Sequence, residues 1–147
     1  MDQEQEKNPN EEKKDYLKSY KKTRNRLNSL ELQRKQIRID MLHVRASKGD
    51  GMPRAKGETA DLSRYIEQMA NLEEQIDDKR SELMDKQAEI TAAINSLDDD
   101  DECTIMTEKY LNGKTWEQVA EDNGFAWRTM HRIHGRALKK IKLENLA

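Results

Sequence analysis

Two long stretches of the chain place an apolar residue at every seventh position, which is the spacing of a coiled-coil seam. The first stretch runs from about Glu11 to Ala46 and carries one such series through Leu30, Ile37 and Val44. The second runs from Glu58 to Leu97, and its series has no gap: Leu62, Met69, Ile76, Leu83, Ile90 and Leu97. A single helix cannot bury so narrow a stripe, so each predicted helix needs a partner.

The segment between these helices, SKGDGMPRAKG at 47–57, holds three glycines and a proline. No helix continues through such a segment, so we expect a loop that folds the second helix back on the first as an antiparallel hairpin. The charge pattern favours this pairing, because residues 11–48 sum to +7 and residues 58–102 sum to −11. An exchange of helices between two chains would use the same stripe, so the pattern leaves intrachain and interchain pairing open.

Two polar segments delimit the predicted hairpin domain, 11–97. Residues 1–10 lack any periodicity and are interpreted as a disordered tail. The run DDDDE at 98–102 is interpreted as an acidic linker, because adjacent aspartates repel one another and form helices poorly. The same residues also suit the start of a new helix, where backbone amides are unpaired.

Residues 103–147 carry shorter apolar repeats that predict three helices and a helix-turn-helix domain. Thr115 and Gln118 have the spacing of a capping box that opens the second of these helices. Gly124 provides the tight turn after it, and the small Ala120 allows the next helix to cross closely. The positions expected to be buried are Val119, Ala120, Phe125, Met130 and Ile133.

With those positions turned inward, the last helix, at about 126–141, presents a basic outer face. Arginine near the start of a recognition helix is the commonest reader of guanine, whereas later lysines suit phosphates. Cations are disfavoured in a first helical turn, so dipole compensation does not account for Arg128 and Arg132. The residues predicted to read bases are Trp127, Arg128, His131 and Arg132. The residues predicted to contact phosphate are Thr115, Arg136, Lys139 and Lys140.

Trp127 and the histidines of this helix also have interpretations that involve no contact with DNA. Trp127 can lie on DNA or cover the domain against a partner, and the sequence favours neither. His131 and His134 are three residues apart, but no cysteine or carboxylate joins them at metal-ligand spacing, so we expect no metal. We expect His134 to pack near the helix core.

Composition excludes several classes of protein. Hydrophobic residues make up 34% of the chain and charged residues 38%, which is too little apolar material for one compact globule of 147 residues. No window is apolar enough for a membrane span, and the single Cys103 is expected to be a small buried side chain in a cytoplasmic protein. No acid–base pair, nucleophile constellation or phosphate loop is present, so we expect neither an enzyme nor a bound cofactor.

The C-terminal stretch EKYLNGKTWEQVAEDNGFAWRTMHRIHGRALKKIK resembles region 4 of bacterial sigma factors, whose helix-turn-helix reads the −35 promoter element. The layout of residues 11–142, including GDGMPRAKGETADLSRYI, resembles small phage-encoded, sigma-region-4-like regulators of Firmicutes related to the ArpU/RinA late-gene activators. Ala126 departs from this pattern, since such motifs usually carry a capping serine there. The resemblance implies binding to double-stranded DNA on the host nucleoid and control of phage or mobile-element transcription.

The sequence therefore predicts an all-α protein: a long antiparallel helical hairpin, or coiled coil, followed by a small helix-turn-helix domain of sigma region 4 type. The first hypothesis for its function is a transcriptional regulator whose hairpin forms a homo-oligomer or contacts RNA polymerase. The alternative is a phage assembly or packaging adaptor that uses the coiled coil for interaction and binds DNA only loosely. Salt dependence and sequence preference of DNA binding separate the two.

Overall fold

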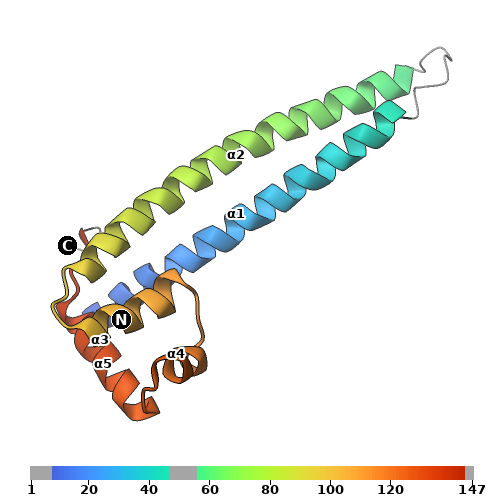
Figure 1. Cartoon of the computed structure of the whole chain (residues 1–147). Coiled ribbons are helices and arrows are strands. Elements are labelled where there is room, and N and C mark those ends of the chain that lie inside the picture. Colours follow the sequence, from blue (N-terminus) through green and yellow to red (C-terminus); the bar gives the residue numbers. More distant parts are fainter. Residues whose placement is uncertain (1–7, 47–55, 145–147) are drawn as a thin grey trace, which may run out of the picture. The chain divides into compact units, whose positions relative to one another are not determined.

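The protein is described here by a computed structural model that places residues 8–46 and 56–144 (Figure 1). The described residues are helical and contain no strand, in agreement with the all-α prediction. None of the described helices is long and apolar enough to cross a membrane. The elements are α1 (Pro9–Ala46), α2 (Lys56–Asn95), α3 (Asp100–Met106), the π-helical turn η1 (Thr107–Leu111), α4 (Trp116–Asn123) and α5 (Trp127–Lys140).

The chain forms two compact units whose boundaries cut across both long helices. Unit 1 comprises residues 1–23 and 83–147, and unit 2 comprises residues 24–82. The predicted boundaries, a hairpin domain ending at residue 97 and a separate domain from residue 103, do not coincide with this division. The reason is that the first turns of α1 and the last turns of α2 pack with the C-terminal helices rather than only with each other.

Unit 2 consists of the later part of α1 and the earlier part of α2, which lie side by side and antiparallel (Figure 1). An ion pair of 3.0 Å between the Arg80 guanidinium and the Glu31 carboxylate joins them. Two of the predicted seam residues in this unit, Leu30 and Ile76, are buried. Four others are half-buried: Ile37, Val44, Leu62 and Met69. Leu27 and Leu72 complete the buried set.

The limits of the second long helix differ slightly from the prediction. It begins at Lys56 and ends at Asn95, two residues earlier at each end than the pattern indicated. Most of the predicted 47–57 loop, and nearly all of the predicted 1–10 tail, lie outside the described residues. Ile66 has 51% of its surface exposed, because it lies on the flank of the seam rather than in it.

Unit 1 encloses a core to which five helical segments contribute. Leu17 and Tyr20 come from α1, and Ile90 and Ile94 come from α2. They pack with Met106, Tyr110, Ala137, Leu138, Ile141 and Leu143 from the C-terminal elements. Leu17 is fully buried although it lies outside the predicted seam series, and the predicted seam residue Leu83 is half-buried at the edge of this core.

The acidic run is only partly a linker, because its last three residues, 100–102, belong to α3. The Asp99 side chain caps α3 by accepting a hydrogen bond from the Glu102 amide at 3.0 Å, and residues 100–102 form the first turn. The negative charges therefore lie at the positive end of the helix dipole, where they are stabilising. Glu102 is completely buried, and its carboxylate pairs with cations of α5. These contacts, which the prediction of a linker did not foresee, hold the end of the acidic run in the helix.

Candidate nucleic-acid interface

The three helices α3, α4 and α5 meet in a second small core. Ile105, Val119 and Met130 are completely buried in it, and Ile133 is 5% exposed. Trp116, Ala120 and Phe125 pack against these side chains and are half-buried. The positions that the helix-turn-helix pattern placed inward therefore face the interior here.

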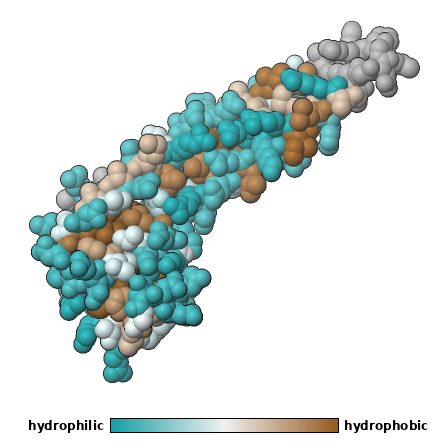
Figure 2. All heavy atoms as spheres, viewed as in Figure 1, coloured by the Kyte–Doolittle hydropathy of each residue, from teal (hydrophilic) through white to brown (hydrophobic). Residues whose placement is uncertain are grey.

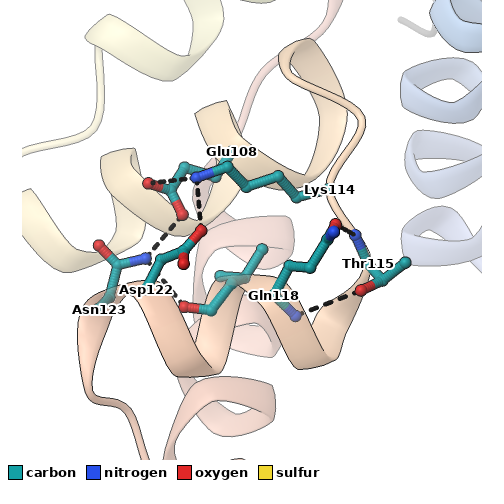
Figure 3. Close-up of polar contacts among 7 residues, drawn as sticks. Glu108, Lys114, Thr115, Gln118, Asp122 and Asn123 are labelled. Carbon is teal, nitrogen blue, oxygen red and sulfur yellow. Dashed lines mark hydrogen bonds and ion pairs between the residues drawn. The ribbon is translucent and has the colours of Figure 1, made fainter.

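Local hydrogen bonds fix where α4 begins and ends. The Thr115 hydroxyl accepts a hydrogen bond from the Gln118 amide at 3.2 Å, and the Gln118 side chain accepts one from the Thr115 amide at 3.0 Å (Figure 3). At the other end, Gly124 adopts a left-handed conformation with φ of +69°, which costs glycine little. Because its hydroxyl caps α4, Thr115 has a structural role beside any contact with phosphate.

A polar cluster holds the turn after η1 against the end of α4 (Figure 3). The Lys114 ammonium lies 2.9 Å from Asp122 and 3.4 Å from Glu108. The Asn123 amide donates to Glu108 at 2.6 Å and to the Val119 carbonyl at 2.9 Å. The hydrogen bond to Asp122 is the main reason why the pKa of Lys114 is raised, so this side chain is a cationic anchor of the turn.

The first two turns of α5 present cations to solvent. Arg128 and Arg132 are exposed, and no ion pair involves either of them within the part of the chain that the structure describes. Trp127 beside them is 50% exposed. The backbone begins the helix at Ala126 without any side-chain cap, so the first amides of α5 are open to an external acceptor.

His131 is less available than the sequence indicated. Its ring lies 4.9 Å from that of Trp116 and 4.6 Å from that of Trp127, centroid to centroid, and the side chain is half-buried. The prediction placed His131 on the outer face; the structure places it between two indoles, where it supports Trp127. The ammonium of Lys109 covers Trp116 at 4.8 Å from the ring centroid, and burial lowers the pKa of this lysine.

His134 lies in the interior, as its position on the helix suggested. Its Nε2 atom is 2.7 Å from the Tyr110 hydroxyl, and only 5% of the residue is exposed. Burial, with smaller contributions from Lys14 and other cations, lowers the pKa of His134 to about 4. Burial also raises the pKa of Tyr110, so this buried pair is neutral near pH 7.

The predicted phosphate-contacting residues of α5 differ in their availability. The Lys140 ammonium lies 3.0 Å from the buried Glu102 carboxylate, and the Arg136 guanidinium lies 3.6 Å from it. Both cations are still about half exposed, but the buried Glu102 carboxylate neutralises part of their charge. Lys139 is exposed, and its backbone carbonyl, like that of Leu138, accepts a hydrogen bond from Lys13 of α1.

Glu102 is the residue of this site that the sequence reasoning missed. A lone glutamate after four aspartates gives no hint of burial by itself. Its burial could have been predicted from the helical repeat, since it lies three residues before Ile105 and four before Met106, both of which are buried. Its Oε2 atom is buried without a hydrogen-bond partner among the described residues, so the contacts of this carboxylate are chiefly those with its two cations.

The described residues contain no group of three or more histidine, cysteine or acidic side chains that could hold a metal ion. The Cys103 thiol is half-buried, and its Sγ lies 3.4 Å from the carbonyl oxygen of Ile94 and 3.4 Å from that of Leu97, either of which can accept its single hydrogen. Burial, assisted by the neighbouring acidic residues, raises the pKa of this thiol. The thiolate is therefore disfavoured at neutral pH.

No curated protein and no solved structure has a significant match to the chain. One family model matches residues 54–142, a region that includes α2, α3, η1, α4 and α5 but not α1. Because this match covers more than half of the 147 residues, the chain belongs to the family described as a protein of unknown function, DUF1492.

Proposed function

We propose that this chain is a sequence-specific DNA-binding regulator of transcription from phage or mobile-element genes, built around a helix-turn-helix of sigma region 4 type. In this proposal α5 is the recognition helix and enters the major groove with its first two turns. The observation that carries it is the pair of exposed arginines on those turns, Arg128 and Arg132, which have no ion pair among the described residues and lie opposite the buried Met130 and Ile133. The long helices form a hairpin that presents this domain to DNA or to RNA polymerase.

The division of cations along α5 supports this assignment. The two early arginines lie on one face with Trp127, and arginine makes bidentate hydrogen bonds to guanine that discriminate between bases by about 1–3 kcal/mol each. The later Arg136 and Lys140 share the Glu102 carboxylate, so they suit phosphates at reduced strength. The uncapped amides at the start of α5 are a further site where a backbone phosphate is favoured.

The geometry around α4 supports the same function. Recognition of base edges requires the reading helix to be held rigidly. Here Gly124 forms the α4–α5 turn, while the Thr115–Gln118 capping box and the Lys114 ion pairs hold α4 in place. The ring array of Trp116, His131 and Trp127 braces the outer side of α5.

The experiment that tests the proposal has two steps. Duplexes bound by the full chain are first selected from a random pool, and affinity for the selected and a scrambled duplex is then titrated. We expect Arg128→Ala and Arg132→Ala each to reduce the ratio of the two affinities about 10- to 100-fold. Arg64→Ala, which removes an exposed arginine from unit 2, is the matched control and is expected to leave the ratio unchanged.

A second variant separates affinity from specificity. Lys139→Ala removes an exposed lysine and is expected to weaken binding to both duplexes alike and to reduce the salt dependence of log K by about one counterion. If Arg128→Ala and Arg132→Ala both kept the wild-type ratio, α5 would not be the reading element. Failure of the selection to enrich any sequence would favour the alternative of an adaptor with loose DNA binding.

A further inference from the structure

The first turns of α1 carry a row of three lysines on the side turned away from α2. Lys14, Lys18 and Lys21 follow one another at spacings of four and three residues, so they lie on one face of the helix. The Tyr16 hydroxyl donates to the Glu89 carboxylate of α2. Tyr16 is two residues, or about 200° around the helix, from Lys14 on one side and from Lys18 on the other. This lysine row therefore points away from the contact, and pairing with the acidic α2 does not account for it.

The C-terminal helices hold the lysine row in place. Leu17 and Tyr20, which lie between the lysines in sequence, are buried in the core of unit 1 with side chains of the C-terminal elements. At the start of α1, the Lys13 ammonium donates to the backbone carbonyls of Leu138 at 2.9 Å and Lys139 at 3.4 Å. A buried contact and a polar contact thus fix the place of the row relative to α5.

Lys109 of η1 extends the lysine row toward the aromatic rings of α4 and α5. Burial lowers the pKa of Lys109, and the positive charges of the lysine row lower it further, while Glu117 of α4 acts in the opposite direction. The Lys109 ammonium lies 4.8 Å from the centroid of the Trp116 ring. The contact of Trp116 with the His131 ring leads on to Trp127. A strip of cations and aromatic rings therefore runs from α1 to the start of α5.

The lysine row and Lys109 form no ion pair within the part of the chain that the structure describes. Lys18 and Lys21 are exposed, and Lys14 is half-buried. The cations near the end of α5 differ from them, because they share the buried Glu102 carboxylate. Unpaired cations that are held close together repel one another, and a bound polyanion relieves that repulsion.

The dimensions of the row suit the backbone of a nucleic acid. The seven residues from Lys14 to Lys21 span about 10 Å of helix axis, and one strand of B-form DNA presents about three phosphates over that length. Surfaces that bind DNA are also more polar and more positive than those that bind proteins. In the view of Figure 2, mainly hydrophilic side chains cover the C-terminal helices, with smaller hydrophobic areas between them. The chemistry of the row thus fits a phosphodiester backbone better than an apolar partner.

We propose that the lysine row and Lys109 form a second DNA-binding surface, which binds the phosphate backbone of the duplex whose bases α5 reads. This inference rests on the proposed function and extends the DNA contact from the C-terminal helices to α1. The family model matches residues 54–142 and does not include α1, so the row adds a contact outside the matched region. The surface contributes affinity and salt dependence but no choice of sequence, because phosphates are the same in every sequence.

Salt-dependent titration tests this surface. Near physiological salt, Lys18→Ala and Lys21→Ala are each expected to weaken binding of the selected and the scrambled duplex alike, by about threefold to tenfold. Each is also expected to reduce the slope of log K against log salt concentration by about one, and the double variant by about two. Lys35→Ala, the same change at an exposed position of α1 in unit 2, is the control and is expected to bind like the wild type. Helix content by circular dichroism shows that each variant is folded.

The outcomes separate this inference from the proposed function. If Lys18→Ala and Lys21→Ala kept the wild-type slope while Arg128→Ala lost selectivity, the lysine row would not contact DNA, although α5 would still be the reading helix. If the lysine variants lowered the slope while Arg128→Ala kept its selectivity, the row would stand and α5 would not be the reading element. A fall in the ratio of the two affinities for the lysine variants would overturn a contact with the backbone alone.

Directed cleavage locates the surface on the duplex. In a Cys103→Ser background, Lys18→Cys carries an iron chelate that cuts the DNA backbone nearby. We expect cuts at a fixed position beside the selected sequence, and no cuts from the same chelate on Lys35→Cys. Uniform cutting along the duplex would show that the row meets DNA only in non-specific complexes, and it would overturn the binding of one duplex by α1 and α5 together.

Discussion

Unit 1 and unit 2 use the same two long helices but bury their apolar residues in different ways. In unit 1 the helix ends are covered by the C-terminal elements, and residues such as Leu17, Ile90 and Ile141 are completely buried. Among the described residues of unit 2 each helix packs against one other helix, and side chains such as Leu32 and Leu42 remain mostly exposed. A two-helix pair covers one face of each helix, so apolar side chains on the other faces stay exposed.

The two units also differ in how far their charged side chains are buried or paired. In unit 1 several charges are part of the fold: Glu102 is buried under Lys140, and Lys114 joins Glu108 to Asp122. In unit 2 the acidic and basic side chains lie mostly at the surface, with Arg80–Glu31 as a crossing ion pair that is about half exposed. Exposed pairs contribute about 0–1 kcal/mol, so unit 2 depends on its narrow seam for stability.

The largest expected effect tests that seam. Ile76→Asp places a carboxylate at a position with no exposed surface and is expected to destabilise unit 2 by more than about 3 kcal/mol. Asn71→Asp, an acidic change at an exposed position on the same helix, is the control. Chemical denaturation followed by circular dichroism measures both. Unchanged unfolding of Ile76→Asp would contradict the buried seam and remove the basis of the comparison.

Truncation of core side chains sharpens the contrast between the units. Ile105→Ala in unit 1 removes a completely buried side chain and is expected to cost about 3–4 kcal/mol. Ile37→Ala in unit 2 makes the same chemical change at a half-buried position and is expected to cost about 1–2 kcal/mol. The free energies of unfolding are compared at one protein concentration, so that any self-association affects both variants alike. Equal costs would show that unit 2 is buried as well as unit 1.

The third prediction concerns the pH dependence of unit 1. The buried His134 has a pKa of about 4 instead of about 6.5, so the unfolded chain binds a proton in this range that the folded chain does not. Stability therefore falls as the pH drops below about 6.5, and the loss reaches roughly 2–3 kcal/mol by pH 4. His134→Gln keeps a hydrogen-bonding group beside Tyr110 but does not titrate, so its stability is expected to fall less steeply. An identical slope for both proteins would exclude His134 as the cause.

The smallest effects concern the helix starts that position α5. Thr115→Ala removes the α4 cap and is expected to cost about 1 kcal/mol. Ala126→Ser adds a cap where α5 has none and is expected to gain about 0.5–1 kcal/mol. Thermal unfolding measures both, and opposite shifts of the melting temperature are expected. A destabilising Ala126→Ser would mean that the first turn of α5 already has its amides satisfied.

Local spacing alone was enough to predict the two long helices, α4 and α5, because apolar periodicity and the capping residues act within a few positions. The seam residues Leu30 and Ile76, the Thr115–Gln118 box and the left-handed turn at Gly124 all follow from such short-range rules. The exposed arginines of α5 could also be read in this way, since inward and outward positions alternate with the helical period.

The tertiary structure alone decided which of these residues have partners far away in the chain. Glu102 lies next to four aspartates in sequence, yet its carboxylate is buried beneath Arg136 and Lys140. His131 is placed between Trp116 and Trp127, and Leu17 is covered by the C-terminal helices. The periodicity of one helix specifies which face is apolar, but the surface that covers that face depends on how separate segments pack, and no local pattern contains that information.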